Sequence, residues 1–208
     1  MTKRLLDAVL AALGLAVLAP ALAAIAAAIR LDSPGPVVYA AQRVGRGGRE
    51  FPMYKFRTMR IDQSGRGPRI TPRGDQRITR VGRVLRRTKL DELPQLWNVL
   101  RGDMSLVGPR PEDPHYVALY SPDQRRVLQA RPGITSLASV RFRDEERLLV
   151  GSDWERTYVN QVMPAKLAID LDYVDHWSLW LDARVVWATA KSLVRGMRNE
   201  ERGMRNEE

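Results

Sequence analysis

An uncharged apolar run near the N-terminus, residues 8–29, constrains this chain more than any other feature. As a straight helix the run would cover about 33 Å, slightly more than the roughly 30 Å hydrocarbon core of a bilayer. No face of such a helix carries polar positions, which argues against a buried helix of a soluble core. The run therefore predicts a membrane segment.

Three kinds of membrane segment fit the run. A signal peptide would use Lys3, Arg4 and the small residues at 21–23 as a cleavage site, although apolar residues continue beyond that site. A spanning anchor fits by length. A re-entrant hairpin would break near Pro20, because proline removes a helical hydrogen bond, and return to the same side. Basic residues, Arg30 among them, flank both ends, and positive flanks mark the cytoplasmic side, so translocation of either end is disfavoured.

Composition indicates the kind of partner and excludes several kinds of catalytic or metal site. The 208 residues predict a single domain, and a net charge of +10 indicates an anionic partner: nucleic acid, phosphorylated small molecules or an anionic membrane surface. The absence of cysteine excludes disulfides, zinc–thiolate sites, iron–sulfur clusters and a cysteine nucleophile. Two histidines are too few for a histidine-rich metal site.

Hydrophobic periodicity and turn residues predict the remaining elements. Strands are expected over 37–39, 51–59 and 134–141, and helices over 77–87, 95–100, 116–130 and 154–195. The stretch 62–75 is predicted to be a loop, and Pro164 and residues 175–178 are predicted to interrupt the last helical region. Residues 195–208 repeat one heptapeptide and are predicted to form a disordered tail.

Three tryptophans, Trp177, Trp180 and Trp187, share one helical face. They could form a core-facing stripe. They could also mark an interfacial helix, because Trp rings favour the depth of the lipid headgroups.

A basic segment leads into two adjacent carboxylates, Asp91 and Glu92. The basic residues over 77–89 fit a solvated helix surface, a nucleic-acid backbone site or a phosphate pocket. The acidic pair fits a capping box that begins at Thr88. It equally fits a carboxylate nucleophile beside a second carboxylate, with Mg²⁺ bridging acid and phosphate and the nearby cations keeping Asp91 ionised. Spacing alone does not choose between them.

The 35-residue segment 78–112, which includes Leu-Asp-Glu-Leu-Pro at 90–94 and Gly-Pro-Arg-Pro at 108–111, resembles the signature of the bacterial sugar transferase family, the monotopic phosphoglycosyl transferases. Three further stretches agree with this resemblance: 3–7, 55–59 and 131–135. The likeness extends over residues 3–193.

The resemblance implies a reaction in which a UDP-sugar donates its sugar phosphate to a polyprenyl phosphate and UMP leaves. Asp91 would attack the sugar-linked phosphate to form a phosphosugar–aspartyl intermediate, Glu92 would complete the dyad, and both would hold Mg²⁺. The remaining expected site residues contact phosphate, nucleotide, metal or acceptor: Arg110, Lys55, Arg86, Arg143 and Asp170. Membrane lipids are further expected partners, and nucleic acid is not.

The implied fold is α+β and mainly helical, with a small antiparallel sheet and amphipathic interfacial helices. Residues 1–31 would form a re-entrant helix-break-helix hairpin broken at Pro20, and residues 32–194 a catalytic domain on the cytoplasmic face of the bacterial inner membrane. The chain departs from the common family pattern at Ala19, where many members have Ser, and over 136–144. The alternative from another functional class is a non-enzymatic basic protein that binds nucleic acid or anionic lipid.

Overall fold

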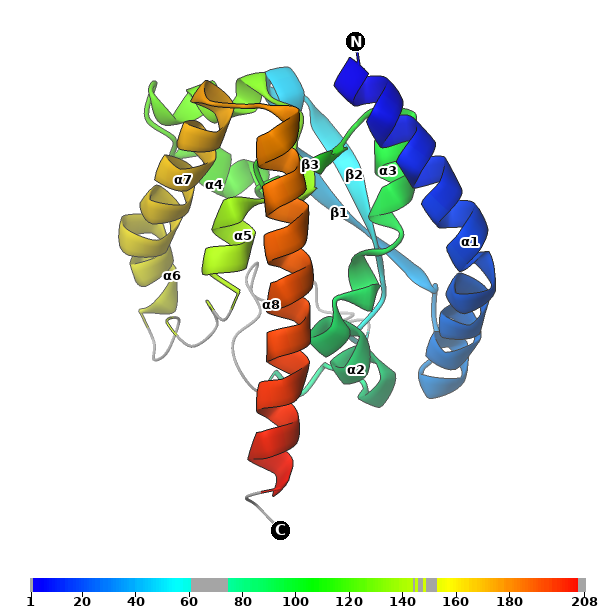
Figure 1. Ribbon diagram of the computed structural model, residues 1–208. Coiled ribbons are helices and arrows are strands. Elements are labelled where there is room, and N and C mark those ends of the chain that lie inside the picture. The colour runs from blue at the N-terminus through cyan, green and yellow to red at the C-terminus, as the bar shows by residue number, and fades with distance from the viewer. Residues whose placement is uncertain (1, 61–74, 144, 146–147, 149–152, 206–208) are drawn as a thin grey trace.

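The computed structural model describes residues 2–60, 75–143, 145, 148 and 153–205, with only the backbone described beyond residue 195. Helices surround two small sheets (Figure 1). In chain order the elements are α1 (Thr2–Asp32), β1 (Val38–Val44), η1 (Arg46–Gly48), β2 (Glu50–Phe56), α2 (Arg80–Thr88), η2 (Leu90–Glu92), α3 (Gln95–Arg101), β3 (Ser105–Val107), α4 (Pro114–Ala118), η3 (Gln124–Gln129), β4 (Gly133–Thr135), α5 (Leu137–Arg141), α6 (Trp154–Thr157), the π-helical turn η5 (Tyr158–Val162), α7 (Met163–Asp175) and α8 (Leu179–Arg205).

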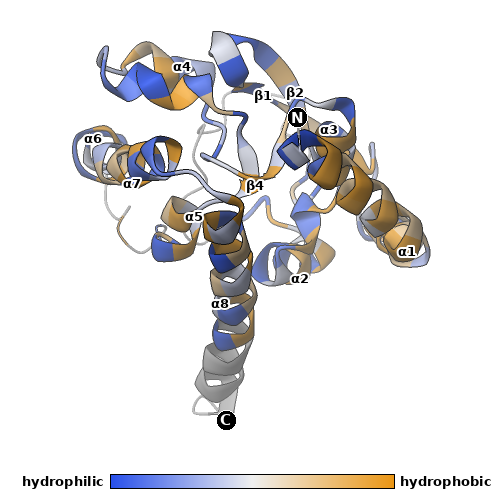
Figure 2. Cartoon of the chain, turned by 45° about the horizontal axis from the view of Figure 1, so that its top comes forward, coloured by the Kyte–Doolittle hydropathy of each residue, from blue (hydrophilic) through white to orange (hydrophobic). Residues whose placement is uncertain are grey.

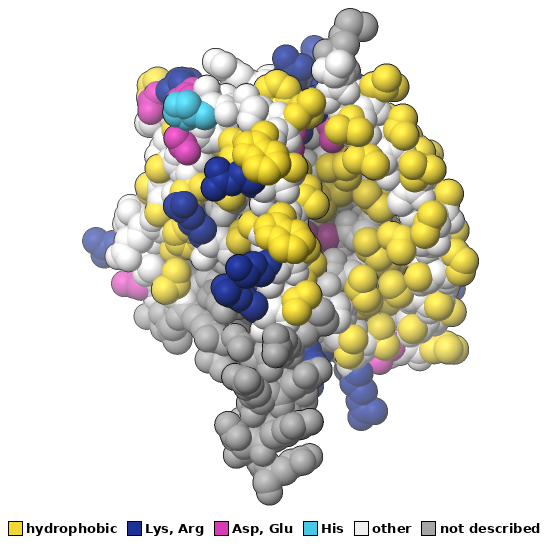
Figure 3. Space-filling view, in the orientation of Figure 1, with side chains coloured by type: hydrophobic (Ala, Val, Ile, Leu, Met, Phe, Trp, Pro, Cys, Tyr) yellow, Lys and Arg dark blue, Asp and Glu magenta, His cyan; other side chains and the backbone are white. Residues whose placement is uncertain are grey.

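Helix α1 carries the apolar run and continues without interruption through Pro20. The helix bends along its length (Figure 1) but does not break, which differs from the predicted helix-break-helix. Proline removes one hydrogen bond while its own φ stays helical, so a bend is sufficient to accommodate it. Hydrophobic residues make up most of α1 (Figure 2), and apolar side chains cover its visible face (Figure 3); only 6% of its most apolar stretch is buried. Re-entrance into a membrane stays a prediction.

The N-terminal end of α1 is held by a buried polar cluster, which we call the anchor network: Lys3, Asp7, Ser105, the backbone N–H of Leu106, Tyr173, Trp177 and Asp182. Asp7 accepts hydrogen bonds from the hydroxyl of Ser105 at 2.7 Å and from the N–H of Leu106 at 3.3 Å. Asp182 forms an ion pair with Lys3 and accepts hydrogen bonds from the hydroxyl of Tyr173 and the indole N–H of Trp177. The anchor network therefore joins α1, β3, α7 and α8.

The C-terminal end of α1 is held by a second set of polar contacts. The buried guanidinium of Arg57 donates to the carbonyl oxygens of Ser33 and Pro34 at 2.6 and 2.7 Å. The N–H of Val81 on α2 donates to Asp32 at 3.2 Å. Both ends of the apolar helix are therefore bound to the same domain.

An antiparallel hairpin, β1–β2, lies beside α3, with its register running from Val38 opposite Phe56 to Val44 opposite Glu50. The predicted strands at 37–39 and 51–59 are confirmed in type, and their bounds are corrected. The turn uses Gly47 and Gly48 at positive φ, a conformation that glycine adopts without steric cost.

The second sheet pairs β3 with β4 in parallel. Gly108 and Gly133 permit this close crossing, since a Cβ on Gly133 would lie 2.1 Å from the backbone nitrogen of Gly108. The strand predicted over 134–141 is wrong beyond Thr135. The hydroxyl of Ser136 accepts a hydrogen bond from the N–H of Ser139 and begins α5 instead.

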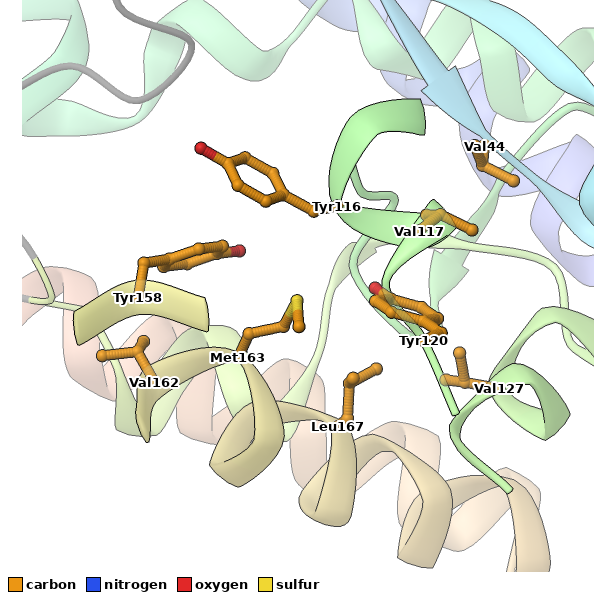
Figure 4. Packing of buried hydrophobic residues seen from close by; sticks show 9 residues of the cluster. All are labelled: Val44, Tyr116, Val117, Tyr120, Val127, Tyr158, Val162, Met163 and Leu167. Atoms are coloured by element: carbon orange, nitrogen blue, oxygen red, sulfur yellow. The ribbon is translucent and has the colours of Figure 1, made fainter. Parts of the chain in front are cut away.

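The largest core cluster joins β1, α4, η3, η5 and α7 (Figure 4). The helix predicted over 116–130 is divided into α4 and the short η3, because Pro122 restricts the backbone of the residue before it. Pro164 does not interrupt the helical region, since it occupies the first turn of α7, where no helical N–H is required. The predicted break at 175–178 is confirmed.

The tryptophans of the predicted stripe are not on the buried face of α8. Val185 is wholly buried, whereas Trp180 and Trp187 are 74% and 73% exposed and Trp177 is 44% exposed. The three rings are therefore not a core stripe. The helix continues to Arg205, through the first heptapeptide and into the second, where we predicted a disordered tail. The predicted loop over 62–75 lies outside the described residues except for its last one.

Candidate active site

The short turn η2, which follows α2 directly, carries the two adjacent carboxylates. Thr79 caps α2 by accepting a hydrogen bond from Gly82, and Gly82 is required because a Cβ there would lie 2.0 Å from the carbonyl oxygen of Thr58. Helix α2 ends at Lys89, which has a φ of +58° and is the one non-glycine residue with positive φ in the described part of the chain. Such a strained residue commonly lies next to a functional site.

The predicted capping box does not form. The hydroxyl of Thr88 donates to the carbonyl oxygens of Val84 and Leu85 at the end of α2, at 2.9 and 3.2 Å, so it does not cap the turn that follows. The acidic pair therefore lies beyond the helix end and is not engaged as a helix cap.

Glu92 is the centre of a buried ionic group. Its Oε1 atom accepts a hydrogen bond from Nζ of Lys55 at 2.9 Å and from Nη2 of Arg110 at 2.8 Å. Burial would raise the pKa of Glu92, but the charges of Arg110 and Lys55 outweigh it and hold that pKa well below its usual range. Burial lowers the pKa of Lys55. We call Lys55, Asp91, Glu92 and Arg110 the catalytic cluster.

Asp91 differs from its neighbour. It is 7% exposed, and its Oδ1 atom has no hydrogen-bond partner among the described residues. Burial raises the pKa of Asp91, with the charge of Glu92 adding to the effect, while Lys55, Lys89 and Arg86 oppose it. The nearby cations expected to keep Asp91 ionised do lower its pKa, as predicted, but desolvation has the larger effect.

Arg110 follows β3 and lies between two prolines that restrict its backbone. The charge of Glu92 raises its pKa. Asp170 on α7 is buried behind it, and burial raises the pKa of Asp170 to about 7, against the opposing effects of the backbone N–H of Arg110 and the hydroxyl of Ser136. Asp170 therefore lies close to the backbone N–H of Arg110.

The other expected residues lie around the cluster. Arg86 on α2 acts on Asp91 through its charge, and its Nη1 atom lies 4.0 Å from the sulfur of Met59. Arg143 lies further away, where it donates to the carbonyl oxygen and hydroxyl of Ser192 on α8. Pro20 belongs to α1 and contributes no group to the cluster.

A cavity of about 390 Å³ lies beside the catalytic cluster, between α8, α5 and the start of α3. Glu92 and Arg110 line it, whereas Asp91 does not. Sequence reasoning included Lys89 in the basic segment without singling it out, and it missed two further charged residues of the cavity, Glu145 and Lys166. Lys89 could have been found from its place directly before the acidic pair, but the Lys166–Glu145 ion pair, at 2.7 Å, exists only through folding.

The carboxylate pair could hold a divalent cation only if other groups supplied the rest of its ligands. In the described part of the chain no group of three or more His, Asp or Glu side chains could hold a metal ion. Mg²⁺ needs only one or two carboxylates when substrate phosphates and waters complete its shell. The unpaired Oδ1 of Asp91 is a buried oxygen able to serve as such a ligand, so the residues present fit a phosphate-bound Mg²⁺.

Comparison with known families agrees with this geometry. The model of the family described as "Bacterial sugar transferase" matches residues 1–196. The chain belongs to the bacterial sugar transferase family. That match spans α1 and every element of the catalytic cluster.

Individual relatives in the family carry names that specify enzymes. The chain is 46% identical, over 93% of its length and 70% of the relative's, to a UDP-glucose:undecaprenyl-phosphate glucose-1-phosphate transferase of Caulobacter vibrioides. It is 43% identical to an enzyme of the same name from Xanthomonas campestris, over 91% of the chain and 38% of the relative. It is 37% identical to a UDP-N-acetylgalactosamine-undecaprenyl-phosphate N-acetylgalactosaminephosphotransferase of Aeromonas hydrophila, over 93% of the chain and 44% of the relative.

These names confirm the predicted family and the predicted class of enzyme, the phosphoglycosyl transferases. They also argue against the non-enzymatic alternative. The chain covers less than half of two of these relatives, and the relatives' sugars differ.

Proposed function

We propose that this bacterial sugar transferase moves a sugar 1-phosphate from a UDP-sugar to undecaprenyl phosphate or a similar polyprenyl phosphate, and releases UMP. The product would begin the assembly of a membrane-linked glycan. The observation that carries the proposal is the difference between the two carboxylates: Glu92 is engaged with two cations, and Asp91 has a buried, unpaired oxygen.

Asp91 is the proposed nucleophile. Its Oδ1 atom has no hydrogen bond to lose before it attacks, at least among the described residues. Glu92, in contrast, already accepts hydrogen bonds from Lys55 and Arg110. An oxygen that accepts two charged hydrogen bonds is the weaker nucleophile.

The reaction takes two displacements at one phosphorus atom. First, a carboxylate oxygen of Asp91 attacks the sugar-linked phosphorus of the donor; a P–O bond to the Asp91 carboxylate forms, and the P–O bond to the UMP phosphate breaks. Second, a phosphate oxygen of the acceptor attacks the same phosphorus. The bond to Asp91 breaks, its carboxylate is restored, and the polyprenyl diphosphate sugar leaves.

The other members of the catalytic cluster hold and neutralise phosphate. Lys55 and Arg110 carry positive charge into a buried site, where such charge is worth more than in water. Glu92 holds both cations in position before substrate arrives. Asp91 and Glu92 together would hold Mg²⁺, which when bound neutralises charge on the diphosphate.

The flanking residues have proposed roles that follow their positions. Arg86 faces Asp91 and would contact the donor's phosphates. Asp170 would position the backbone of Arg110. Arg143 is joined to Ser192 and would influence a substrate from the far wall of the cavity.

The membrane helix is proposed to be re-entrant, with both ends on the cytoplasmic face of the bacterial inner membrane. A straight helix of 31 residues extends about 46 Å, longer than a bilayer core of roughly 30 Å. Polar contacts bind both of its ends to one domain, through Lys3 and Asp7 at one end and Arg57 at the other. A spanning path would draw that polar domain into hydrocarbon, whereas a shallow, bent path would leave it at the surface.

Helix α8 is the proposed interfacial helix. The exposed rings of Trp180 and Trp187 on α8, and of Trp177 just before it, suit the headgroup layer, and α1 is held beside the start of α8 by Lys3 and Asp182. Two membrane contacts would orient the cavity toward the lipid acceptor.

The chemical test has two arms. Purified protein with polyprenyl phosphate, Mg²⁺ and a panel of UDP-sugars should release UMP with at least one donor. With labelled donor and no acceptor, label should remain on the protein, and Asp91→Asn should abolish both labelling and turnover. The adjacent variant Glu92→Gln is the matched control, since it should lower the rate but still become labelled. Full turnover in Asp91→Asn would refute the nucleophile.

The topology test uses single cysteines in a chain that has none of its own. Thr2→Cys and Ala40→Cys should both react with an impermeant reagent from the cytoplasmic side only. Reaction of the two positions from opposite sides would establish a spanning helix.

A further inference from the structure

The lining of the cavity beside the catalytic cluster is of two kinds. Glu92 and Arg110 of the cluster contribute charge, as do Lys89, Arg143, Glu145 and Lys166. Most of the remaining wall is hydrocarbon, supplied by six large residues: Leu93, Leu96, Leu106, Ile134, Phe142 and Leu193. In Figure 3 the surface is hollowed between α8 and α1, and an acidic side chain is visible inside.

The polar groups along the cavity wall are largely bonded to one another. The hydroxyls of Thr135 and Thr189 share a hydrogen bond of 2.7 Å. Arg143 donates to Ser192, and the Lys166 ammonium pairs with Glu145. A sugar needs many hydrogen-bond partners, and a group left unpaired in a buried site is costly. The wall therefore suits an apolar ligand better than a sugar or a nucleotide base.

The cavity also adjoins the membrane helix. Leu96, which lines the cavity, packs against α1 so closely that a Cβ on Gly14 would lie 3.3 Å from its Cδ1 atom. One wall thus borders both the catalytic cluster and the helix that carries the apolar run. A ligand that extends from the cluster through this cavity would pass beside α1.

We propose that this cavity binds the first isoprene units of the polyprenyl phosphate acceptor, with the acceptor's phosphate at Arg110. The proposal rests on the proposed function, which supplies a lipid phosphate as substrate. A volume of about 390 Å³ is in the usual range for small-molecule sites, so the cavity holds the start of the chain while the rest stays in the bilayer. Asp91, whose pKa is influenced by the charges of Lys55 and Arg86, does not line the cavity, which leaves the cavity free for the acceptor.

Binding is tested with cysteines placed inside and outside the cavity. Leu193 lines the cavity, and its neighbour Val194 is 51% exposed and does not. In nanodiscs, polyprenyl phosphate should slow maleimide labelling of Leu193→Cys at least fivefold and leave Val194→Cys unchanged. A UDP-sugar should slow neither. Protection of Leu193→Cys by the UDP-sugar alone, or equal behaviour of the two positions, would overturn the proposal.

Kinetics provide a second test that does not depend on one substitution. Leu193→Trp and, on α5, Val140→Phe should each raise the KM for polyprenyl phosphate about tenfold and leave the KM for the UDP-sugar unchanged. Val194→Trp should change neither. A rise in the donor's KM in both cavity variants would assign the cavity to the donor instead.

The two tests separate this proposal from the proposed function. Labelling reports binding without turnover. If the wild-type chain released no UMP with any donor, the proposed function would fail, while protection of Leu193→Cys by polyprenyl phosphate would still support the cavity.

Discussion

The catalytic cluster and the anchor network are both buried polar groups that join distant parts of the chain, but they satisfy their carboxylates differently. In the anchor network all four carboxylate oxygens of Asp7 and Asp182 accept hydrogen bonds. In the catalytic cluster Glu92 accepts two from one oxygen, while Oδ1 of Asp91 has none within the described residues.

This difference distinguishes carboxylates that stabilise the fold from a carboxylate proposed to take part in the reaction. A buried carboxylate with all its partners stabilises one arrangement of helices. A buried carboxylate without a partner costs folding free energy, and such a cost persists where it serves a ligand or a reaction. The same residue type therefore has opposite effects in the two regions, and the following substitutions should separate them.

The largest effect is expected from Asp91→Asn. Activity should fall at least about 1,000-fold, equivalent to about 4 kcal/mol, because the amide cannot form the covalent intermediate. Thermal stability should not fall, since no hydrogen bond to Oδ1 is lost. UMP release and thermal unfolding, measured on the same preparation, check both. A marked loss of stability would place Asp91 with the structural carboxylates and break the comparison.

Asp7→Ala should have the opposite effect, a loss of stability where Asp91→Asn causes a loss of activity. It leaves the hydroxyl of Ser105 and the N–H of Leu106 without their acceptor in a buried site, and should lower the free energy of unfolding by about 3 kcal/mol. Unfolding in detergent micelles measures the effect. Asp123→Ala, at an exposed carboxylate, is the control and should change little. Equal losses from both variants would contradict the role of the anchor network.

Asp170 should make stability depend on pH. Burial raises its pKa to about 7 in the folded chain, against 3.8 for an ordinary aspartate. At pH values between these two, the folded state therefore binds more protons than the unfolded state. Stability should therefore fall as pH rises, by about 1 kcal/mol between pH 6 and pH 8, and level off above. Asp170→Asn should remove this difference in unfolding experiments at the two pH values. A slope that persists in the variant would assign it to another group.

The smallest effect is expected from Lys3→Met. The Lys3 ammonium is partly exposed, and Asp182 keeps its hydrogen bonds from Tyr173 and Trp177. The free energy of unfolding should fall by about 1 kcal/mol or less. Lys3→Arg, which keeps the charge, is the matched control. A loss as large as that of Asp7→Ala would show that the ion pair, and not the hydrogen bonds of Asp7, carries the anchor network.

Local sequence signals predicted the parts of the site that depend on neighbours in the chain. The basic helix before Asp91, its end near Lys89 and the paired prolines around Arg110 all follow from residues a few positions apart. Where such signals failed, a nearby competing preference decided the outcome: Ser136 began a helix where a strand was predicted, and Pro122 divided a predicted helix.

The sequence by itself determined that the chain has an N-terminal apolar segment long enough to enter a membrane, that two carboxylates stand together after a basic helix, and that no cysteine takes part. Only the tertiary structure decided which carboxylate is paired. Lys55 and Arg110 reach Glu92 from 37 and 18 residues away, and burial outweighs charge at Asp91. The physical reason is that hydrophobic patterning and capping act over a few residues, whereas ion pairing and desolvation depend on which distant surfaces pack together.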